Sequence, residues 1–128
     1  MQKIRIFNNG KENMPLMKED IGEWVKKLRD SQKLILVEGK KDKSALEKLD
    51  IVNVKTLKEP LFKAVETIAD KYKEVIILTD LDKEGKKLYA KLNRDFQMRG
   101  IKVDHFFREF LFKNTKLRQI EGLTTYLG

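Results

Sequence analysis

The sequence predicts an α/β domain built on a mainly parallel β-sheet. Two short runs, KLILV (33–37) and EVIIL (74–78), are almost wholly apolar, as expected for strands buried on both faces. Segments with apolar residues at helical spacing lie between such runs, and this alternation of strands and helices is typical of parallel sheets. A chain of 128 residues with 41% apolar content is expected to form one hydrophobic core.

The elements follow one another in a regular order. A first amphipathic helix starts near Glu19, and its apolar stripe consists of Ile21, Trp24, Val25 and Leu28. Strands are expected at 33–37, 50–54, 74–78 and 101–106, and helices at 40–49, from Pro60 through Ala69, from the end of TDLD to Gly100, at 107–112 and at 121–127. Residues 1–18 are expected to be a lead-in, with KIRIF either a short edge strand or disordered, and 19–128 a single domain.

Composition limits the chemistry that the chain can perform. The absence of cysteine and the presence of a single histidine mean that any metal site must use oxygen ligands. There is no apolar run of membrane-spanning length and no secretory signal, so we expect no membrane association and a location in the cytoplasm of a bacterium or archaeon.

The net charge of +8 is unevenly distributed, because residues 83–128 carry 11 Lys/Arg against five Asp/Glu. This excess favours a polyanionic partner such as DNA or RNA. A lysine-rich surface that serves solubility or a hot habitat is the alternative interpretation.

Carboxylates follow two of the expected strands. Glu38 comes directly after 33–37, and Asp80 and Asp82 come shortly after 74–78. Ligands of parallel sheets bind beyond the carboxyl ends of the strands. If these two strands are neighbours in the sheet, their ends lie about 5 Å apart, close enough for Glu38 and Asp80 to share one ion. Oxygen ligands without His or Cys indicate Mg²⁺, or Mn²⁺ in its place.

Glycines and lysines accompany these acids. Gly39 and Gly85 would allow a sharp turn or a close approach of backbone to phosphate. The surrounding lysines are candidate phosphate contacts: Lys40, Lys41, Lys83, Lys86 and Lys87. The alternative is that each motif is only the polar turn that joins a strand to a helix in any α/β protein.

The motifs VEGKKD (37–42) and TDLDKEG (79–85) resemble those of the Toprim family, over about residues 33–106. That family includes primases, type IA and type II topoisomerases, OLD-type nucleases, RecR-type mediators and a ribosomal RNA maturase ribonuclease. The resemblance implies a Rossmann-like three-layer α/β/α fold with about four strands. The chain has no room for the further domains of a primase or topoisomerase, so it resembles the free-standing small Toprim proteins.

The resemblance also implies roles for the acids, with Glu38 as general acid or base and Asp80 and Asp82 holding Mg²⁺. The expected function is therefore metal-dependent chemistry on nucleic-acid phosphodiesters, most simply a nuclease. The alternative is a non-catalytic nucleic-acid-binding or accessory module. Asp42 is interpreted either as the cap or first-turn acid of its helix or as a residue supporting the metal.

The segment HFFREFLFK (105–113) interleaves aromatic and basic residues, which suggests either a platform for unpaired bases or a core or subunit-interface helix. The i, i+4 spacing of Phe106 with Phe110 and of Phe107 with Leu111 favours core or interface. A homodimer is possible through such an aromatic surface. A haloacid-dehalogenase phosphatase motif or a phospho-receiver domain fits less well, because neither uses Glu38-Gly39.

Overall fold

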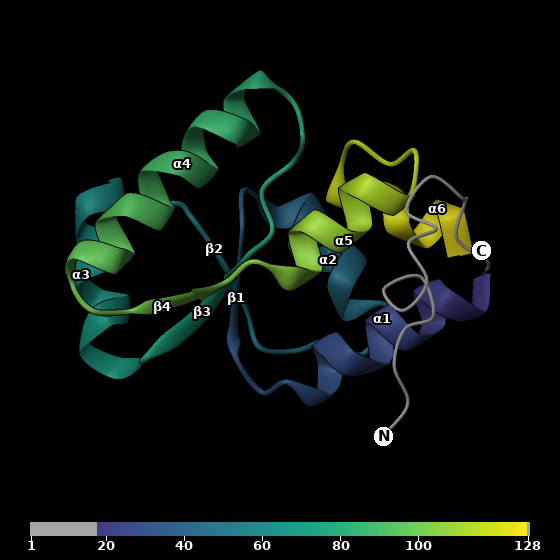
Figure 1. The fold of residues 1–128 in the computed structure, drawn as a ribbon, viewed down its shortest axis with the longest axis horizontal. Helices are drawn as coiled ribbons and strands as arrows, with labels where there is room; N and C mark the ends of the chain where they lie inside the picture. Colours follow the sequence, from purple (N-terminus) through teal and green to yellow (C-terminus); the bar gives the residue numbers. More distant parts are fainter. Residues whose placement is uncertain (1–17, 128) are drawn as a thin grey trace.

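The computed structural model describes residues 18–127. Strands and helices alternate along this part of the chain (Figure 1). The elements in order are α1 (Lys18–Asp30), β1 (Leu34–Val37), α2 (Lys40–Glu47), β2 (Val54–Thr56), α3 (Leu61–Lys71), β3 (Glu74–Ile77), α4 (Lys83–Met98), β4 (Lys102–Asp104), α5 (Phe106–Asn114), the 3₁₀ turn η2 (Ile120–Gly122) and α6 (Leu123–Leu127).

The four strands form one parallel sheet in the order β2-β1-β3-β4. Leu34 pairs with Val75 and Ile35 with Ile76, so β1 and β3 are neighbours in register. From β1 the chain moves outward to β2, and from β3 it moves outward in the opposite direction to β4. The carboxyl ends of β1 and β3 therefore form the topological switch point, where doubly wound sheets bind their ligands.

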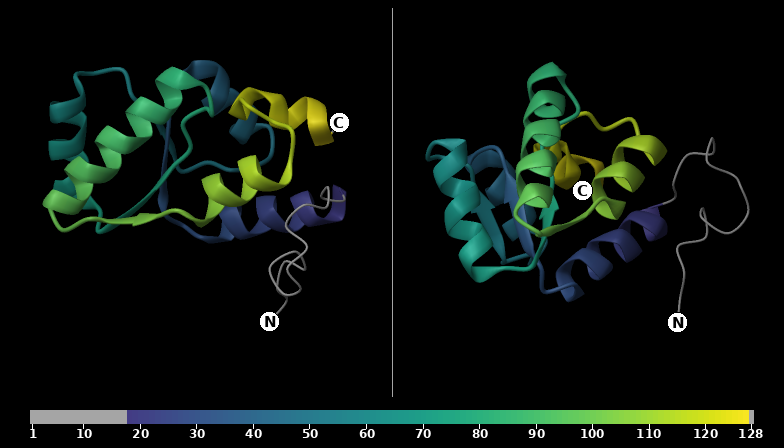
Figure 2. Two further views of the ribbon diagram at one scale, coloured as in Figure 1. Left: turned by 45° about the horizontal axis from the view of Figure 1, so that its top comes forward. Right: turned by 60° about the vertical axis from the view of Figure 1, so that its left-hand side comes forward.

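Helices cover both faces of the sheet, which makes three layers (Figure 2). Side chains of α1, α2, α5 and the C-terminal turn pack on Ile35 and Val37, whereas α3 and α4 pack on Leu34 and Leu36. Successive strand residues point to opposite faces, so a strand between two helix layers must be apolar at every position. The expected α/β/α fold with a four-stranded parallel sheet is confirmed.

Two predicted strands are placed or sized wrongly. The strand expected at 50–54 begins only at Val54, because Asp50 adopts a left-handed conformation with φ 63° and the chain continues irregularly. In that loop Ile51 is buried while Val52 is 79% exposed. The strand expected at 101–106 ends at Asp104, whose carboxylate accepts the backbone N–H of Phe106 at the start of α5 (3.1 Å).

The aromatic segment 105–113 belongs to the core. Phe107, Phe110 and Leu111 are at most 5% exposed, and the Trp24 indole N–H donates to the carbonyl of Phe107 (3.0 Å). Burial of Phe107, Phe110 and Leu111 agrees with the core interpretation of these side chains. None of the helices within 18–127 combines the length and apolar character that crossing a membrane requires. The lead-in at 1–18, including KIRIF, lies outside the described residues except for Lys18.

Candidate metal and phosphodiester site

Glu38 links the ends of the two central strands. It follows β1 directly, and its carboxylate Oε2 accepts the backbone N–H of Asp80 across the sheet (2.7 Å). The expectation that these two acids meet at neighbouring strand ends is confirmed by the pairing of β1 with β3. The second oxygen of Glu38, Oε1, makes no hydrogen bond within the described part of the chain and can receive a ligand.

The segment from Thr79 to Gly85 is a tight connection between β3 and α4. The Asp82 carboxylate caps α4 by accepting the N–H of Gly85 (2.8 Å), and the Thr79 hydroxyl donates to the Gly85 carbonyl (2.8 Å). A Cβ atom on Gly85 would lie 2.1 Å from the carbonyl oxygen of Asp80. Gly85 is thus required because α4 starts in direct contact with the backbone that carries the candidate ligands.

The C-terminal segment also forms part of the site. The backbone N–H of Ile120 donates to Oδ1 of Asp80 (2.8 Å), and the carbonyl of Arg118 accepts the N–H of Leu81 (2.8 Å). These contacts tie the loop after β3 to the C-terminal segment. Sequence analysis missed them, since backbone contacts made some forty residues away leave no local pattern.

Arg108 is a second component that the sequence analysis missed. Its side chain is buried, and Nε and Nη2 donate to the carbonyls of Thr79 (2.9 Å) and Asp80 (2.8 Å). The guanidinium lies 4.5 Å from the ring centre of Tyr89 and 5.4 Å from that of Phe112, so cation–π contacts add to the hydrogen bonds. The available signal was an arginine within an otherwise apolar helix face of the aromatic segment.

The carboxylates at this edge are electrostatically strained. Burial, together with the charges of Asp80 and Asp82, raises the pKa of Glu38, although the hydrogen bond from Asp80 N–H and the charge of Arg108 oppose the rise. Burial likewise raises the pKa of Asp80, aided by Asp82 and by Glu121 of the C-terminal segment. Desolvation and mutual repulsion of several acids is the condition that a bound cation would relieve.

Asp42 belongs to the same cluster. It lies in the first turn of α2, is 7% exposed, and its carboxylate Oδ2 accepts the N–H of Gly39 (3.3 Å). This contact agrees with the first-turn interpretation. Burial and the charges of Asp80, Glu38 and Glu121 raise its pKa to about 6. Asp42 is therefore both a helix-start residue and an electrostatic neighbour of the candidate ligands.

The candidate phosphate-binding lysines are exposed and surround the acids in two groups. Lys40 and Lys41 start α2, and the others lie in the first turns of α4: Lys83, Lys86 and Lys87. Helix N-termini carry partial positive charge, which reinforces the lysines toward a phosphate.

The donor set suits a hard divalent cation, because every candidate ligand is a carboxylate oxygen. Within residues 18–127, no three His, Asp or Glu side chains already form a cluster that could hold a metal ion. One oxygen each of Glu38, Asp80 and Asp82 is taken by a backbone N–H, which leaves their other oxygens for a ligand. These three residues fit Mg²⁺ or Mn²⁺ provided that their side chains converge further.

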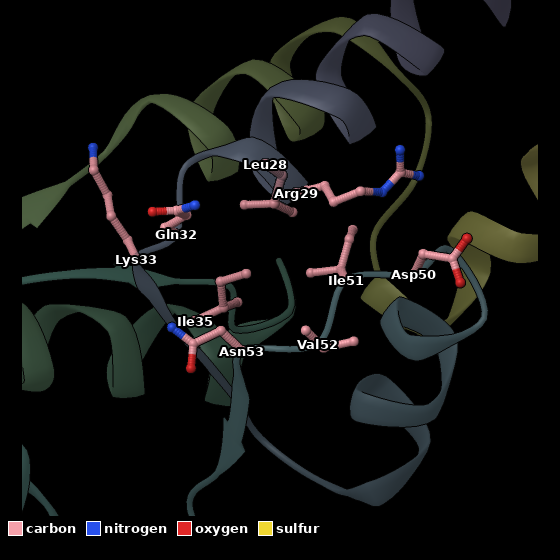
Figure 3. A pocket seen from close by; sticks show the side chains of 9 residues that line it. All are labelled: Leu28, Arg29, Gln32, Lys33, Ile35, Asp50, Ile51, Val52 and Asn53. Carbon is pink, nitrogen blue, oxygen red and sulfur yellow. The ribbon is translucent and has the colours of Figure 1, made fainter.

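A cavity of about 450 Å³ lies away from the acids, between the end of α1, the start of β1 and the loop 50–53 (Figure 3). Its apolar lining comes from Leu28, Ile35, Ile51 and Val52, with polar side chains around them. None of the candidate site residues lines it. The candidate site therefore lies at the carboxyl ends of the strands, and this cavity lies near the amino end of β1.

The fold and the site define a doubly wound α/β protein with an acidic centre at its topological switch point. Comparison with known families makes the assignment specific, because residues 33–110 match the model of the Toprim domain. The chain therefore belongs to the Toprim-domain family.

Its relatives include small proteins of similar length. A UPF0292 protein from Methanocaldococcus jannaschii is 38% identical over 107 residues, which cover 80% of this chain and 84% of the relative. A UPF0292 protein from Pyrococcus abyssi is 40% identical over 101 residues, covering 77% of this chain and 75% of the relative. A solved structure of a protein from Aquifex aeolicus superimposes with a TM-score of 0.74 at 38% identity, covering 79% of this chain and 95% of that one.

Proposed function

We propose that this protein is a metal-dependent enzyme acting on nucleic-acid phosphodiester bonds, most simply a nuclease that works on DNA or RNA in the cytoplasm. Membership of the Toprim family supports a nucleic-acid-related function in general. The observation that carries the finer proposal is the hydrogen bond between Glu38 and the Asp80 backbone at the switch point. Asp82 and the exposed lysines in the first turns of α2 and α4 lie near it in the chain.

In this proposal the aspartates hold the cation, and Glu38 both helps to hold it and moves a proton. Asp80 and Asp82, together with Glu38, hold Mg²⁺ or Mn²⁺, which when bound polarises the phosphodiester and offsets developing charge. Glu38 also transfers the proton, because the two aspartates bind the cation as well and the Glu38 carboxylate lies beside them at the reacting phosphate. The lysines at the starts of α2 and α4 contact flanking phosphates, and Arg108 fixes the backbone that carries Asp80.

A non-catalytic nucleic-acid-binding or accessory module is the second candidate. One observation favours it: Asp82 already has a structural task as the cap of α4, and an acid that caps a helix need not bind metal. The same acidic edge would then hold a cation and a nucleic-acid backbone without turnover.

Cleavage assays separate the two candidates. End-labelled single- and double-stranded DNA and RNA are incubated with the protein in Mg²⁺, Mn²⁺ or EDTA. We expect metal-dependent cleavage that falls by at least about 100-fold in Glu38→Gln and Asp80→Asn, because each removes a group acting at the reacting phosphate. The matched controls are Glu66→Gln and Asp70→Asn, which make the same chemical changes at exposed positions of α3.

The outcomes differ clearly. Nucleic-acid and Mg²⁺ binding without cleavage of any of the four substrates would support the accessory module. Calorimetry that detects no Mg²⁺ or Mn²⁺ binding to the wild-type protein would contradict both candidates. Circular dichroism of each variant shows whether the fold is retained.

A further inference from the structure

A polar groove runs beside the acidic edge, between α2 and the C-terminal segment. These two parts of the chain lie side by side although they are some eighty residues apart (Figure 2). The groove has a volume of about 380 Å³. Polar side chains line most of it: Lys41, Ser44, Lys48, Gln119, Glu121, Thr124 and Thr125.

One wall is formed by one face of α2 and by Lys48, the C-cap residue that follows it. Lys41, Ser44 and Lys48 follow one another at i, i+3 and i+7, so they point the same way, whereas Lys43 lies outside the lining. Both groove lysines are exposed, and neither forms a salt bridge with another described residue. At a helical rise of about 1.5 Å per residue they are about 10 Å apart along the axis, far enough to reach different phosphates.

The groove opens onto the candidate metal site. Glu121 lines it, and the charge of Glu121 contributes to the raised pKa values of both Asp42 and Asp80. The preceding residue, Ile120, donates its backbone N–H to the Asp80 carboxylate. A chain of phosphates that has one member at the acids would therefore enter the groove directly.

We propose that this groove holds the sugar-phosphate backbone of the nucleic-acid strand that continues from the acidic site, with Lys41 and Lys48 contacting successive parts of it. The inference rests on the proposed nucleic-acid function and specifies where the strand runs. The described lining residues supply ammonium, hydroxyl and amide groups and the carboxylate of Glu121, and include no aromatic ring. The groove thus contacts backbone and does not stack bases, so binding is independent of sequence and strongly dependent on salt.

Fluorescence anisotropy with labelled oligonucleotides of two unrelated sequences, each as single strand and duplex, in DNA and RNA, tests this placement. Ca²⁺ replaces Mg²⁺ in the buffer, so that the acidic site holds a cation while cleavage is suppressed. The variant Lys41→Gln/Lys48→Gln is compared with Lys43→Gln/Lys71→Gln, which loses the same two charges outside the groove. We expect the groove variant to bind about tenfold more weakly at moderate salt, with a log–log salt slope reduced by about 1.4 for a single strand or 1.8 for a duplex. The control should change less than twofold.

A negative charge on the opposite wall gives an independent test. Thr125→Glu should weaken binding as well, whereas Thr67→Glu on the exposed surface of α3 should leave it unchanged. Equal losses in groove and control variants would overturn the groove and indicate diffuse charge attraction. Affinities that depend on the oligonucleotide sequence would overturn backbone recognition.

Failure of the groove and failure of the nuclease proposal give different results. If the wild-type protein binds but does not cleave, and the groove variants bind more weakly, the groove stands and the nuclease activity does not. If the wild-type protein cleaves and all variants bind equally, the nuclease activity stands and the groove does not. A wild-type protein that binds no oligonucleotide at all contradicts both.

Discussion

Charged side chains serve different purposes at the amino ends and at the carboxyl ends of the strands. Near the amino ends of β1 and β3, the Lys33 ammonium lies between the carboxylates of Asp104 (2.7 Å) and Glu74 (3.1 Å), and these paired charges join β1 and β3 to β4. At the carboxyl ends of the strands, Glu38 and Asp80 lie close to further acids. The buried Arg108 there donates its hydrogen bonds to backbone carbonyls and forms no salt bridge with these acids within the described residues.

The Lys33 network consists of charges that pair with one another and so stabilise the fold. The acids around Glu38 and Asp80 repel one another and can instead bind a cation. The Lys33 ammonium offsets both carboxylates, and a substitution there should cost little more than a partly exposed ion pair. The acids at the carboxyl edge are kept close by Gly85, Arg108 and the C-terminal segment in spite of their repulsion. Groups held at an energetic disadvantage in this way are typical of functional sites.

Gly85→Ala should give the largest effect. The added Cβ would collide with the Asp80 carbonyl at 2.1 Å, and both partners are backbone, so we expect a loss of about 3 kcal/mol or more in the free energy of unfolding, or failure to fold. Gly39→Ala is the matched control at the same edge, because a Cβ there meets nothing within 4 Å. Urea unfolding measures both, and similar stabilities would contradict the close approach of α4.

Arg108→Met should be the next largest. It leaves the carbonyls of Thr79 and Asp80 without their donors, and we expect a loss of about 2–3 kcal/mol in the free energy of unfolding together with weaker Mg²⁺ binding. Lys at this position keeps the charge without the two-pronged contact, so Arg108→Lys should recover only part of either property. Arg118→Met, at an exposed side chain nearby, is the control, and an equal effect there would refute a specific role for Arg108.

Asp42→Asn should stabilise the protein in a pH-dependent way. The folded pKa of Asp42 is raised from 3.8 to about 6, so the folded state binds more protons than the unfolded state between these values, and ionisation lowers stability as the pH rises through this window. Asparagine avoids that loss and can still accept the Gly39 N–H. We expect about 1–2 kcal/mol above wild type at pH 7.5, after allowance for solvent screening, and little difference at pH 4.

Thermal or urea unfolding across pH measures the effect of Asp42→Asn. Saturating Mg²⁺ should narrow the gap at pH 7.5 if the cation relieves the repulsion at the acidic edge. A variant less stable than wild type at high pH would show that the carboxylate contributes more by capping α2 than it costs by repulsion.

Lys33→Met at the amino edge should give the smallest effect. The side chains of this network are partly exposed, so we expect a loss of about 1 kcal/mol in the free energy of unfolding, which shrinks when salt is raised to about 1 M. Metal and nucleic-acid binding should not change. A loss as large as that of Arg108→Met would remove the contrast between the two edges.

The sequence by itself determined the order of the elements and the principal acids. Wholly apolar runs identify strands covered on both faces, and the ends of two such strands identify Glu38, Asp80 and Asp82, because these signals are local. Strand limits were less accurate at residues 50–54 and 101–106, where a left-handed Asp50 and an early start of α5 decide the outcome.

Only the tertiary structure decided how the acids are held. Arg108, Ile120 and Arg118 reach the loop after β3 from distant parts of the chain, and two of these three contacts use backbone groups that any residue carries. The same is true of the groove, whose walls come from α2 and the C-terminal segment. Local patterns fix which side chains stand at the ends of strands, but packing between distant segments fixes which groups surround them.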